Sequence, residues 1–293
     1  MLSWIVAGVT YSLDDETITR LLGHDGLGMS PLHRLSERGP LQNGDTDRGF
    51  RLDPRVVLLT LGIHGSDMDD LYAKRSTLTD IFKPRTVAGK LRFERGTTVR
   101  DLDCHLIEGD GLRFSDNDRQ YLWQRCVVAL KASDPTWYDP AGASSLFNLG
   151  AGSDTLEVPM TIPMTVGVST LDTSKTIVYP GTAKVFPRIR ITGPVTNCII
   201  THQQMDWKLD FTGTTIGSGE YFDIDLRYGR KTVIDQAGAN QISTLTNDSD
   251  LAEYSLLPDP DVGGGNNTIG VTGASIDPST EISLTYFVRY IGL

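Results

Sequence analysis

Cysteine is scarce in this chain of 293 residues. Only three are present, Cys104, Cys126 and Cys198, and they are widely spaced. A small scaffold held together by disulfides needs a dense and even set, so this class is excluded. No Cys-x-x-Cys pair occurs and the five histidines are scattered, so the pattern of a zinc site is missing too. We expect buried, reduced thiols; a bond between Cys104 and Cys126 would require neighbouring strands.

Long apolar runs are also missing. No stretch approaches the roughly 20 apolar residues that span a bilayer. The apolar start, Met1 to Val9, is short and has no basic flank, so it predicts a first strand and not a signal peptide. We therefore expect no membrane association, and we expect synthesis and folding in a cytoplasm.

Runs of basic residues are absent as well. The chain has 37 acidic and 27 basic residues, a formal net charge of −10. A nucleic-acid-binding protein usually carries a basic stripe that neutralises phosphates. The densest basic area, Arg85 to Arg100, is interleaved with Glu94 and apolar positions, which is typical of a solvated strand face. Recognition of nucleic acid is therefore not expected.

Motifs for catalysis and for nucleotide or metal binding are lacking. The chain has no Gly-x-Ser-x-Gly, no phosphate-binding Gly-x-x-x-x-Gly-Lys-Ser/Thr and no His-Glu-x-x-His. The acidic segments Asp116 to Asp118 and Asp248 to Asp250 lack the glycine and the late glutamate of a helix–loop–helix calcium site. They are typical of helix caps or turns. We predict no cofactor and no metal.

One acidic pair has a spacing that chemistry could use. Asp223 and Asp225 alternate with Phe222 and Ile224, so both carboxylates face one side of a predicted strand. Strand geometry separates them by roughly 6–7 Å, a distance compatible with a glycosidase pair. Two solvated carboxylates on a strand face are the simpler interpretation, and we predict that the chain is not an enzyme.

What the chain does contain is many turn residues and short alternating segments. With 30 glycines and 14 prolines, it favours a mainly β structure. A single helix is predicted over about residues 67–83. Ser66 is its expected N-cap, Pro84 ends it, and its apolar residues recur at steps of three and four. These stripe residues are Met68, Leu71, Tyr72, Leu78, Ile81 and Phe82, grouped around Arg75.

Two domains are predicted, with a boundary near Pro140. Residues 1–140 contain the helix and the buried strand Arg55–Ile63, and the prolines at 135 and 140 end the last strand. Residues of about 23–50 are rich in Gly, Pro, Ser and Asp. We interpret them as an arm that orders against a neighbouring subunit; a mobile surface loop is the alternative.

Residues 141–293 predict a second β domain. Segment 141–184 is rich in Ser, Thr and Gly and is either a linker or the first strands, such as the fragment Val158–Met160. Short strands with glycine turns then predict a β-sandwich or jelly roll. They cover residues 185–192, 198–201, 207–211, 221–226, 232–235 and 281–291.

The order of these features resembles the distal tail proteins of long-tailed phages with non-contractile tails. The resemblance spans most of the chain, is diffuse in the first domain and is sharper in the second. Its residues are Phe50–Arg55, the helix up to Pro84 and Ala132–Tyr138, followed by Gly181–Pro194 with Asn197, Gly219–Asp225, Tyr228–Val233 and Ser255–Ile269. The chain departs from the pattern at Asp259–Gly265, which replaces a tight Pro-Gly turn.

The resemblance implies an N-terminal split β-barrel with one α-helix and a C-terminal galectin-like sandwich. It also implies a homo-hexameric ring at the tail tip of the virion, assembled in the host cytoplasm. The implied partners are the tail tube protein, a tail-associated hub or fibre protein and a tape measure protein. The family offers no catalytic residues. The alternative is a carbohydrate-binding sandwich for host-surface attachment, with Trp207 as the candidate sugar contact.

Overall fold

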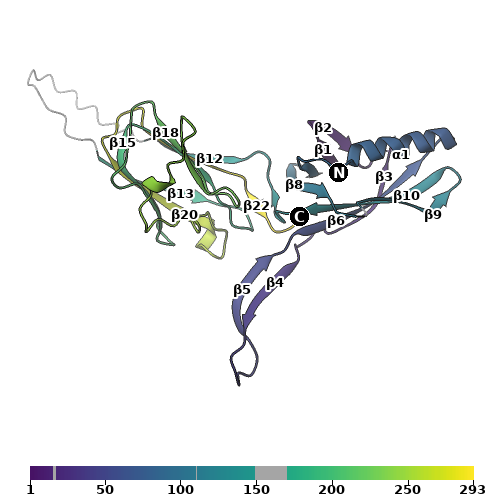
Figure 1. Cartoon of the computed structure of the whole chain (residues 1–293), viewed down its shortest axis with the longest axis horizontal. Helices are drawn as coiled ribbons and strands as arrows, with labels where there is room; N and C mark the ends of the chain where they lie inside the picture. The colour runs from purple at the N-terminus through teal and green to yellow at the C-terminus, as the bar shows by residue number, and fades with distance from the viewer. Residues whose placement is uncertain (16–17, 110, 149–169) are drawn as a thin grey trace, which may run out of the picture. The chain divides into compact units, whose positions relative to one another are not determined.

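The computed structural model describes residues 1–15, 18–109, 111–148 and 170–293. The described residues form two compact units (Figure 1). The N-terminal unit comprises Met1–Pro140 and Tyr290–Leu293, and the C-terminal unit comprises Ala141–Arg289. Strands dominate both units, and the described residues contain one α-helix. The predicted mainly β class with one helix is therefore confirmed.

The N-terminal unit is built on an antiparallel sheet with the strand order β2-β1-β7-β8-β10-β6-β3. Strand β9 pairs with β10, and the short β11 pairs with β8 and β22. Among the described residues, the end strands β2 and β3 have no pairing that would close the sheet, so the barrel implied by the resemblance is not closed. The bounds are β1 Leu2–Val6, β2 Val9–Ser12, β3 Arg20–Asp25, β6 Arg55–His64, β7 Gly89–Arg95, β8 Thr98–Leu106, β9 Leu112–Gln120, β10 Trp123–Ala132, β11 Trp137–Tyr138 and β22 Arg289–Tyr290.

Strand β6 and helix α1 (Met68–Phe82) supply much of this unit's core. β6 pairs with β10 along its whole length, and its alternate side chains Val57, Leu59, Leu61 and Ile63 are fully buried. The helix buries Leu71, Leu78, Ile81 and Phe82 in the same cluster. Each such side chain removed from water stabilises the fold by about 1.5–3 kcal/mol, so the apolar alternation of β6 and the helix stripe determine how the layers pack.

The N-cap of the helix lies one residue later than predicted. Asp67 is the N-cap, and its carboxylate accepts a 2.8 Å hydrogen bond from the main-chain N–H of Asp70. Ser66 instead donates its own N–H to the carboxylate of Asp70. The prediction of Ser66 as cap was wrong because Asp67 has the same capping chemistry one position closer to the helix. At the other end, the helix stops before Lys83 and Pro84, as predicted.

The segment interpreted as an arm, or alternatively as a mobile loop, contains most of a β-hairpin. Strands β4 (Leu32–Glu37) and β5 (Thr46–Leu52) pair with each other, with a bulge between Leu35 and Ser36. We call this hairpin, with its turn, the arm. The two strands were not predicted, because the glycines and prolines of the turn and the bulge are typical of loops. Asp116 to Asp118 likewise lie within strand β9 and not in a turn or a cap.

The C-terminal unit contains two five-stranded antiparallel sheets. One has the order β12-β21-β14-β18-β19, and the other has β13-β20-β15-β16 with β17 on β15. Phe211 and Phe222, one from each sheet region, meet with ring centroids 6.0 Å apart. The bounds are β12 Ala143–Asn148, β13 Thr170–Val178, β14 Arg188–Thr192, β15 Val195–His202, β16 Trp207–Asp210, β17 Thr215–Ile216, β18 Tyr221–Asp225, β19 Thr232–Asp235, β20 Asn266–Ala274 and β21 Glu281–Tyr286, with short 3-10 turns at Ile242–Thr244 and Gly263–Gly265.

The predicted strands of this unit overlap observed strands, but the unit contains further strands that were not predicted. The predicted strand 232–235 coincides with β19, whereas the predicted strand 281–291 divides into β21 and β22. Strand β20 was missed, although Asn267, Ile269 and Val271 alternate on its buried face. The fragment Val158–Met160 lies outside the described residues. The galectin-like character of the sandwich stays a prediction.

A buried cluster of hydrogen bonds around Asn267 joins β15 and β20 in this sandwich. Asn267 is fully buried, and its oxygen lies 2.9 Å from Nε2 of His202 and accepts the N–H of Leu257. Its amide nitrogen donates to the carbonyls of Leu257 and Gly265. An amide is suited to this position because it donates and accepts at once, so each buried backbone group there is satisfied.

Candidate assembly surface

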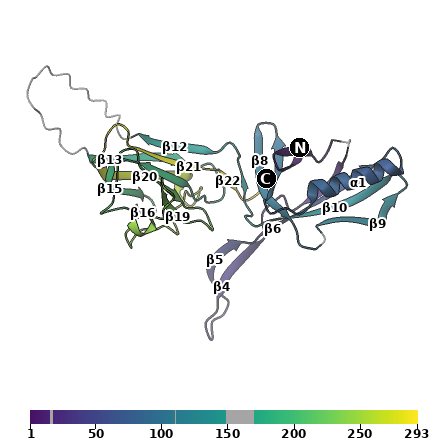
Figure 2. The ribbon, with the colours of Figure 1, turned by 45° about the horizontal axis from the view of Figure 1, so that its top comes forward.

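The arm extends away from the sheet of the N-terminal unit (Figure 1 and Figure 2). Every residue of β4 is exposed. The hairpin is held together by its own ladder and by ion pairs between Arg34 and Asp47 and between Arg48 and Glu37. Leu41 at the tip lies nine positions after Leu32, so at the rise of an extended strand the arm reaches at most roughly 30 Å. A hairpin of this length offers most of its surface to another molecule.

The tip of the arm presents one apolar side chain. Leu41 is 103% exposed and has a backbone φ of +66°, a conformation that costs free energy for a residue with a side chain. Gln42 stabilises this turn through two hydrogen bonds with Gly39. Its side-chain oxygen accepts the N–H of Gly39, and its main-chain N–H donates to the carbonyl of Gly39. The exposed leucine is therefore presented on an ordered turn.

The base of the arm is held by a buried arginine. Arg55 is 1% exposed, and its guanidinium donates to the carbonyls of Gly26, Gly28 and Pro135 and to the hydroxyl of Ser30. It also donates to the carbonyl of Ile291 and lies 5.9 Å from the centre of the Trp137 ring. Desolvation by burial lowers the pKa of Arg55 below its ordinary value. A planar group with five N–H donors can join the arm base, the end of β10 and the C-terminal segment at one point.

The chain approaches β6 closely at the same place. Gly26 has a φ of +83°, and a Cβ on it would lie 2.1 Å from the carbonyl oxygen of Val56. Only glycine fits this backbone, because any side chain would overlap the main chain of β6. The path from β3 into the arm thus depends on Gly26 as well as on Arg55.

The sheet face opposite the helix carries exposed apolar side chains. Val56, Leu58 and Leu22 are 39%, 40% and 45% exposed, and they project from β6 and from the bulge in β3. Leu22 packs over Gly62, beside the indole of Trp123. A group of aliphatic side chains on one sheet face next to a projecting arm is typical of a surface that another subunit covers.

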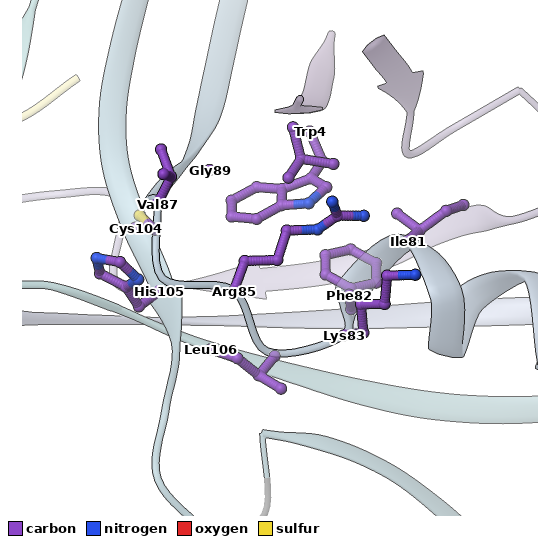
Figure 3. Close-up of a pocket in the computed structure, with 11 residues that line it drawn as sticks. Trp4, Ile81, Phe82, Lys83, Arg85, Val87, Gly89, Cys104, His105 and Leu106 are labelled. Atoms are coloured by element: carbon purple, nitrogen blue, oxygen red, sulfur yellow. The ribbon is translucent and has the colours of Figure 1, made fainter. Parts of the chain in front are cut away.

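The N-terminal unit also has one small pocket near the end of the helix (Figure 3). Its volume is about 20 Å³, and Trp4, Phe82, Arg85 and His105 are among the residues that line it. The indole N–H of Trp4 is buried and has no acceptor among the described residues. This space holds about one water molecule, so it is not a cofactor or substrate site.

The acidic pair that the sequence singled out lies on β18. Asp223 accepts hydrogen bonds from Arg188 and Arg190, and Asp225 accepts them from Arg227. Burial alone would raise the pKa of Asp223, but the two arginines more than offset it and lower that pKa. The hydrogen bond from Arg227 lowers the pKa of Asp225. A glycosidase acid needs a raised pKa, and both pKa values are lowered here, so the pair does not fit that role.

Trp207, the candidate sugar contact, begins strand β16 at an edge of the second sheet. Its ring is half-buried and lies edge-on to the buried His202, with centroids 5.5 Å apart. The neighbouring Lys208 pairs with Asp248 and Asp210. The ring therefore contributes to packing beside the buried hydrogen bonds around Asn267. A sugar contact at Trp207 stays a prediction.

The cysteines lie apart from one another, and all three are buried free thiols. Burial raises the pKa of Cys104, Cys126 and Cys198 to about 12. Cys104 pairs across the sheet with Gly89, and Cys126 pairs with Leu61 and Phe114. Among the described residues, no group of three His, Cys, Asp or Glu side chains could hold a metal ion. No helix there is long and apolar enough to cross a membrane.

Sequence reasoning missed the role of Arg55. The sequence did contain one indication of it. Arg55 lies an even number of residues before Val57, Leu59, Leu61 and Ile63, so its side chain falls on the buried face of β6. A buried arginine needs several acceptors, which could have marked the position as a structural junction. The acceptors themselves come from distant segments and have no local pattern.

A fold of this kind is also found in a solved phage protein structure. The SPP1 Dit protein, described as a paradigm of the hub adsorption apparatus in phages that infect Gram-positive bacteria, aligns over 99% of each chain with a TM-score of 0.67 and 11% identity. The phage P2 baseplate in its activated conformation, with Ca or with Sr, aligns over 97% of this chain and 98% of that chain, with TM-scores of 0.48 and 0.47 and 8% identity. No family model and no curated protein matches the chain. The likeness to SPP1 Dit shows a shared fold.

Proposed function

We propose that this protein is a structural component of a phage tail tip, a distal tail hub that joins the tail tube to the baseplate or fibre proteins. The observation that carries this proposal is the alignment with SPP1 Dit over 99% of both chains. An alignment of that extent includes both units and their order along the chain. Function does not follow from fold alone, so the surface features must support it as well.

The arm supports assembly into a ring. A ring closes when each subunit makes the same head-to-tail contact with the next, so each needs a projecting element and a receiving surface. The arm is the projecting element, and the exposed aliphatic face of Val56, Leu58 and Leu22 is the receiving surface. The copy number that we propose is six, and the further partners are the tail tube, hub or fibre and tape measure proteins.

The rigidity of the arm favours this role over that of a mobile surface loop. An ordered arm loses less conformational entropy on docking than a flexible one does. Arg55 orders its base through buried hydrogen bonds, and Gln42 orders its tip. The exposed Leu41 then needs a partner pocket, because a fully exposed leucine on an ordered turn contributes nothing to the stability of the monomer. In this role the protein positions other proteins and catalyses no reaction.

The test is the native mass of the purified chain by light scattering, with negative-stain images of the main peak. A hexamer has six times the 32.1 kDa of the chain and should show a central hole. Deleting the arm residues 33–51, which keeps Gly26, Gly28 and Ser30 in place around Arg55, should abolish the ring and leave a folded monomer. Replacing Arg85 by Gln on another face is the matched control and should leave the ring intact. A deletion variant that still forms rings would contradict the arm contact, and a wild-type monomer that stays monomeric with tail tube protein would contradict the hub.

A further inference from the structure

A wide groove lies on the outer side of the first sheet of the C-terminal unit. Its volume is about 560 Å³, within the range of small-ligand sites. Strands β14, β18 and β19 form its floor, and the segments 227–230 and 236–238 form its walls. The register places Arg188 opposite Asp225 and Arg190 opposite Asp223, so these four side chains share the outer face.

Carboxylates lie at the floor of this groove and arginines lie higher. The side chains of Asp223 and Asp225 are 14% and 12% exposed. The side chains of Arg188, Arg227 and Arg230 are 51%, 40% and 65% exposed. Each floor carboxylate is fixed by hydrogen bonds from guanidinium groups, so its orientation is set before any ligand arrives. The groove is therefore preorganised and polar.

The groove has more donors than acceptors. A guanidinium has five N–H groups, and Arg188 and Arg227 each use two of them on the floor carboxylates. Arg230 reaches only to 3.9 Å from Asp225. The third carboxylate of the lining, Asp235, accepts from Ala237, Ala239 and Gln241 within its own turn. A ligand for this groove must therefore supply oxygen acceptors.

The floor carboxylates have few acceptor positions left, and the directions of these positions are fixed. Each floor carboxylate offers about four lone-pair positions, and three of them are already used on Asp223 and on Asp225. One position on each remains for a hydroxyl donor. The ring of Tyr221 also lines the groove and is covered on one side by Arg190 at 4.3 Å. The arginines and aspartates are held in place beside the ring of Tyr221. Such a groove suits a ligand that has both hydroxyl groups and an anionic oxygen group.

We infer that this groove binds a saccharide unit that bears an anionic group, a carboxylate or a phosphate. The N–H groups of Arg188, Arg227 and Arg230 that do not bind the floor carboxylates would donate to the anionic oxygens of the ligand. The floor carboxylates would accept hydrogen bonds from the hydroxyl groups of the saccharide. The site is separate from Trp207, which lies on the other sheet. It gives the protein a contact with an acidic surface polysaccharide, and it stands independently of ring assembly.

The test is binding of the full chain to immobilised polygalacturonate and to a phosphate-bearing mannan, with neutral dextran as reference, at low and high salt. Binding to either acidic polymer that weakens with salt, and none to dextran, is the expected result. The variant Arg188→Gln/Arg230→Gln should lower affinity by about tenfold or more. Arg190 still pairs with Asp223 there, so we expect the fold to persist. Arg95→Gln, in the N-terminal unit, is the matched control.

Three results would overturn the inference. They are no binding to either acidic polymer at low salt, equal binding to dextran, and an unchanged affinity in the double variant. Should the double variant fail to fold, the two single variants Arg188→Gln and Arg230→Gln decide the question. The milder of the two is Arg230→Gln. Its side chain makes no contact closer than 3.9 Å with Asp225, so its loss leaves the floor intact. An unchanged affinity for the acidic polymer in this variant and in Arg188→Gln would equally overturn the site.

Discussion

Arg55 donates a hydrogen bond to the main-chain oxygen of Ile291, 236 residues further along the chain. The same guanidinium binds the carbonyls of Gly26 and Gly28 at the base of the arm. One side chain thus fastens the arm and the C-terminal segment to the same point of the N-terminal unit. This link makes the order of the arm depend on the fold of the whole unit.

Replacing Arg55 by Leu should destabilise the N-terminal unit by about 3–5 kcal/mol, because several buried carbonyls then lose their donor. Arg55→Lys keeps the charge but cannot make the planar set of bonds, so we expect a smaller loss of about 2 kcal/mol. Urea unfolding followed by tryptophan fluorescence measures both. The control is Arg51→Leu, whose side chain is 64% exposed and should change stability by about 0.5 kcal/mol at most. Equal effects at Arg55 and Arg51 would contradict the junction.

Replacing Leu41 by Gly should separate assembly from stability. Glycine relieves the positive φ but adds entropy to the unfolded chain, so the stability of the monomer should stay within about 1 kcal/mol of wild type. The apolar anchor is lost, so ring formation should weaken. Leu41→Met keeps an apolar side chain and should still assemble. Sedimentation velocity at several protein concentrations compares the three chains, and rings of equal stability in the glycine variant would count against the anchor.

Acid should destabilise the C-terminal unit through Asp225. The hydrogen bond from Arg227 lowers the folded-state pKa of this carboxyl below its ordinary value of 3.8. The stabilisation is therefore present above pH 3.8 and is lost as the pH falls through the folded-state value. Asp225→Asn should flatten this acid loss and should cost about 1–2 kcal/mol at neutral pH.

Chemical unfolding at a series of pH values measures this dependence. The control is Asp172→Asn, an exposed position on β13, which should leave the acid loss unchanged. If Asp225→Asn unfolds with the same pH slope as wild type, the pair with Arg227 does not stabilise the folded state.

The three thiols should be unreactive in the native protein. With a pKa of about 12, as Cys104, Cys126 and Cys198 each have, only about one thiol in ten thousand is ionised at pH 8, and burial blocks access as well. A colorimetric disulfide reagent should therefore label the protein only as it unfolds, and three equivalents should react in denaturant. A thiol that reacts within minutes in the native protein would show that its strand opens locally.

Local pattern predicted the elements whose signals lie within a few residues. The apolar stripe of α1 ends where Pro84 removes helical geometry, and the alternation of Phe222 and Ile224 identifies β18 with a buried face. The arm was harder, because the residues of β4 are all exposed and show no apolar alternation, and glycine and proline mark its turn. The N-cap is Asp67 and not the predicted Ser66, because both residue types can cap a helix and residue type alone does not choose between them.

The sequence by itself determined the mainly β class, the single helix and the lack of catalytic motifs, because these depend on periodicity and on residue type. Only the tertiary structure decided what surrounds Arg55 and which arginines hold Asp223 and Asp225. Arg188 and Asp223 are 35 residues apart and meet because β14 pairs with β18. Strand pairing is set by burial and register across the whole sheet, so no local pattern in the chain can specify such neighbours.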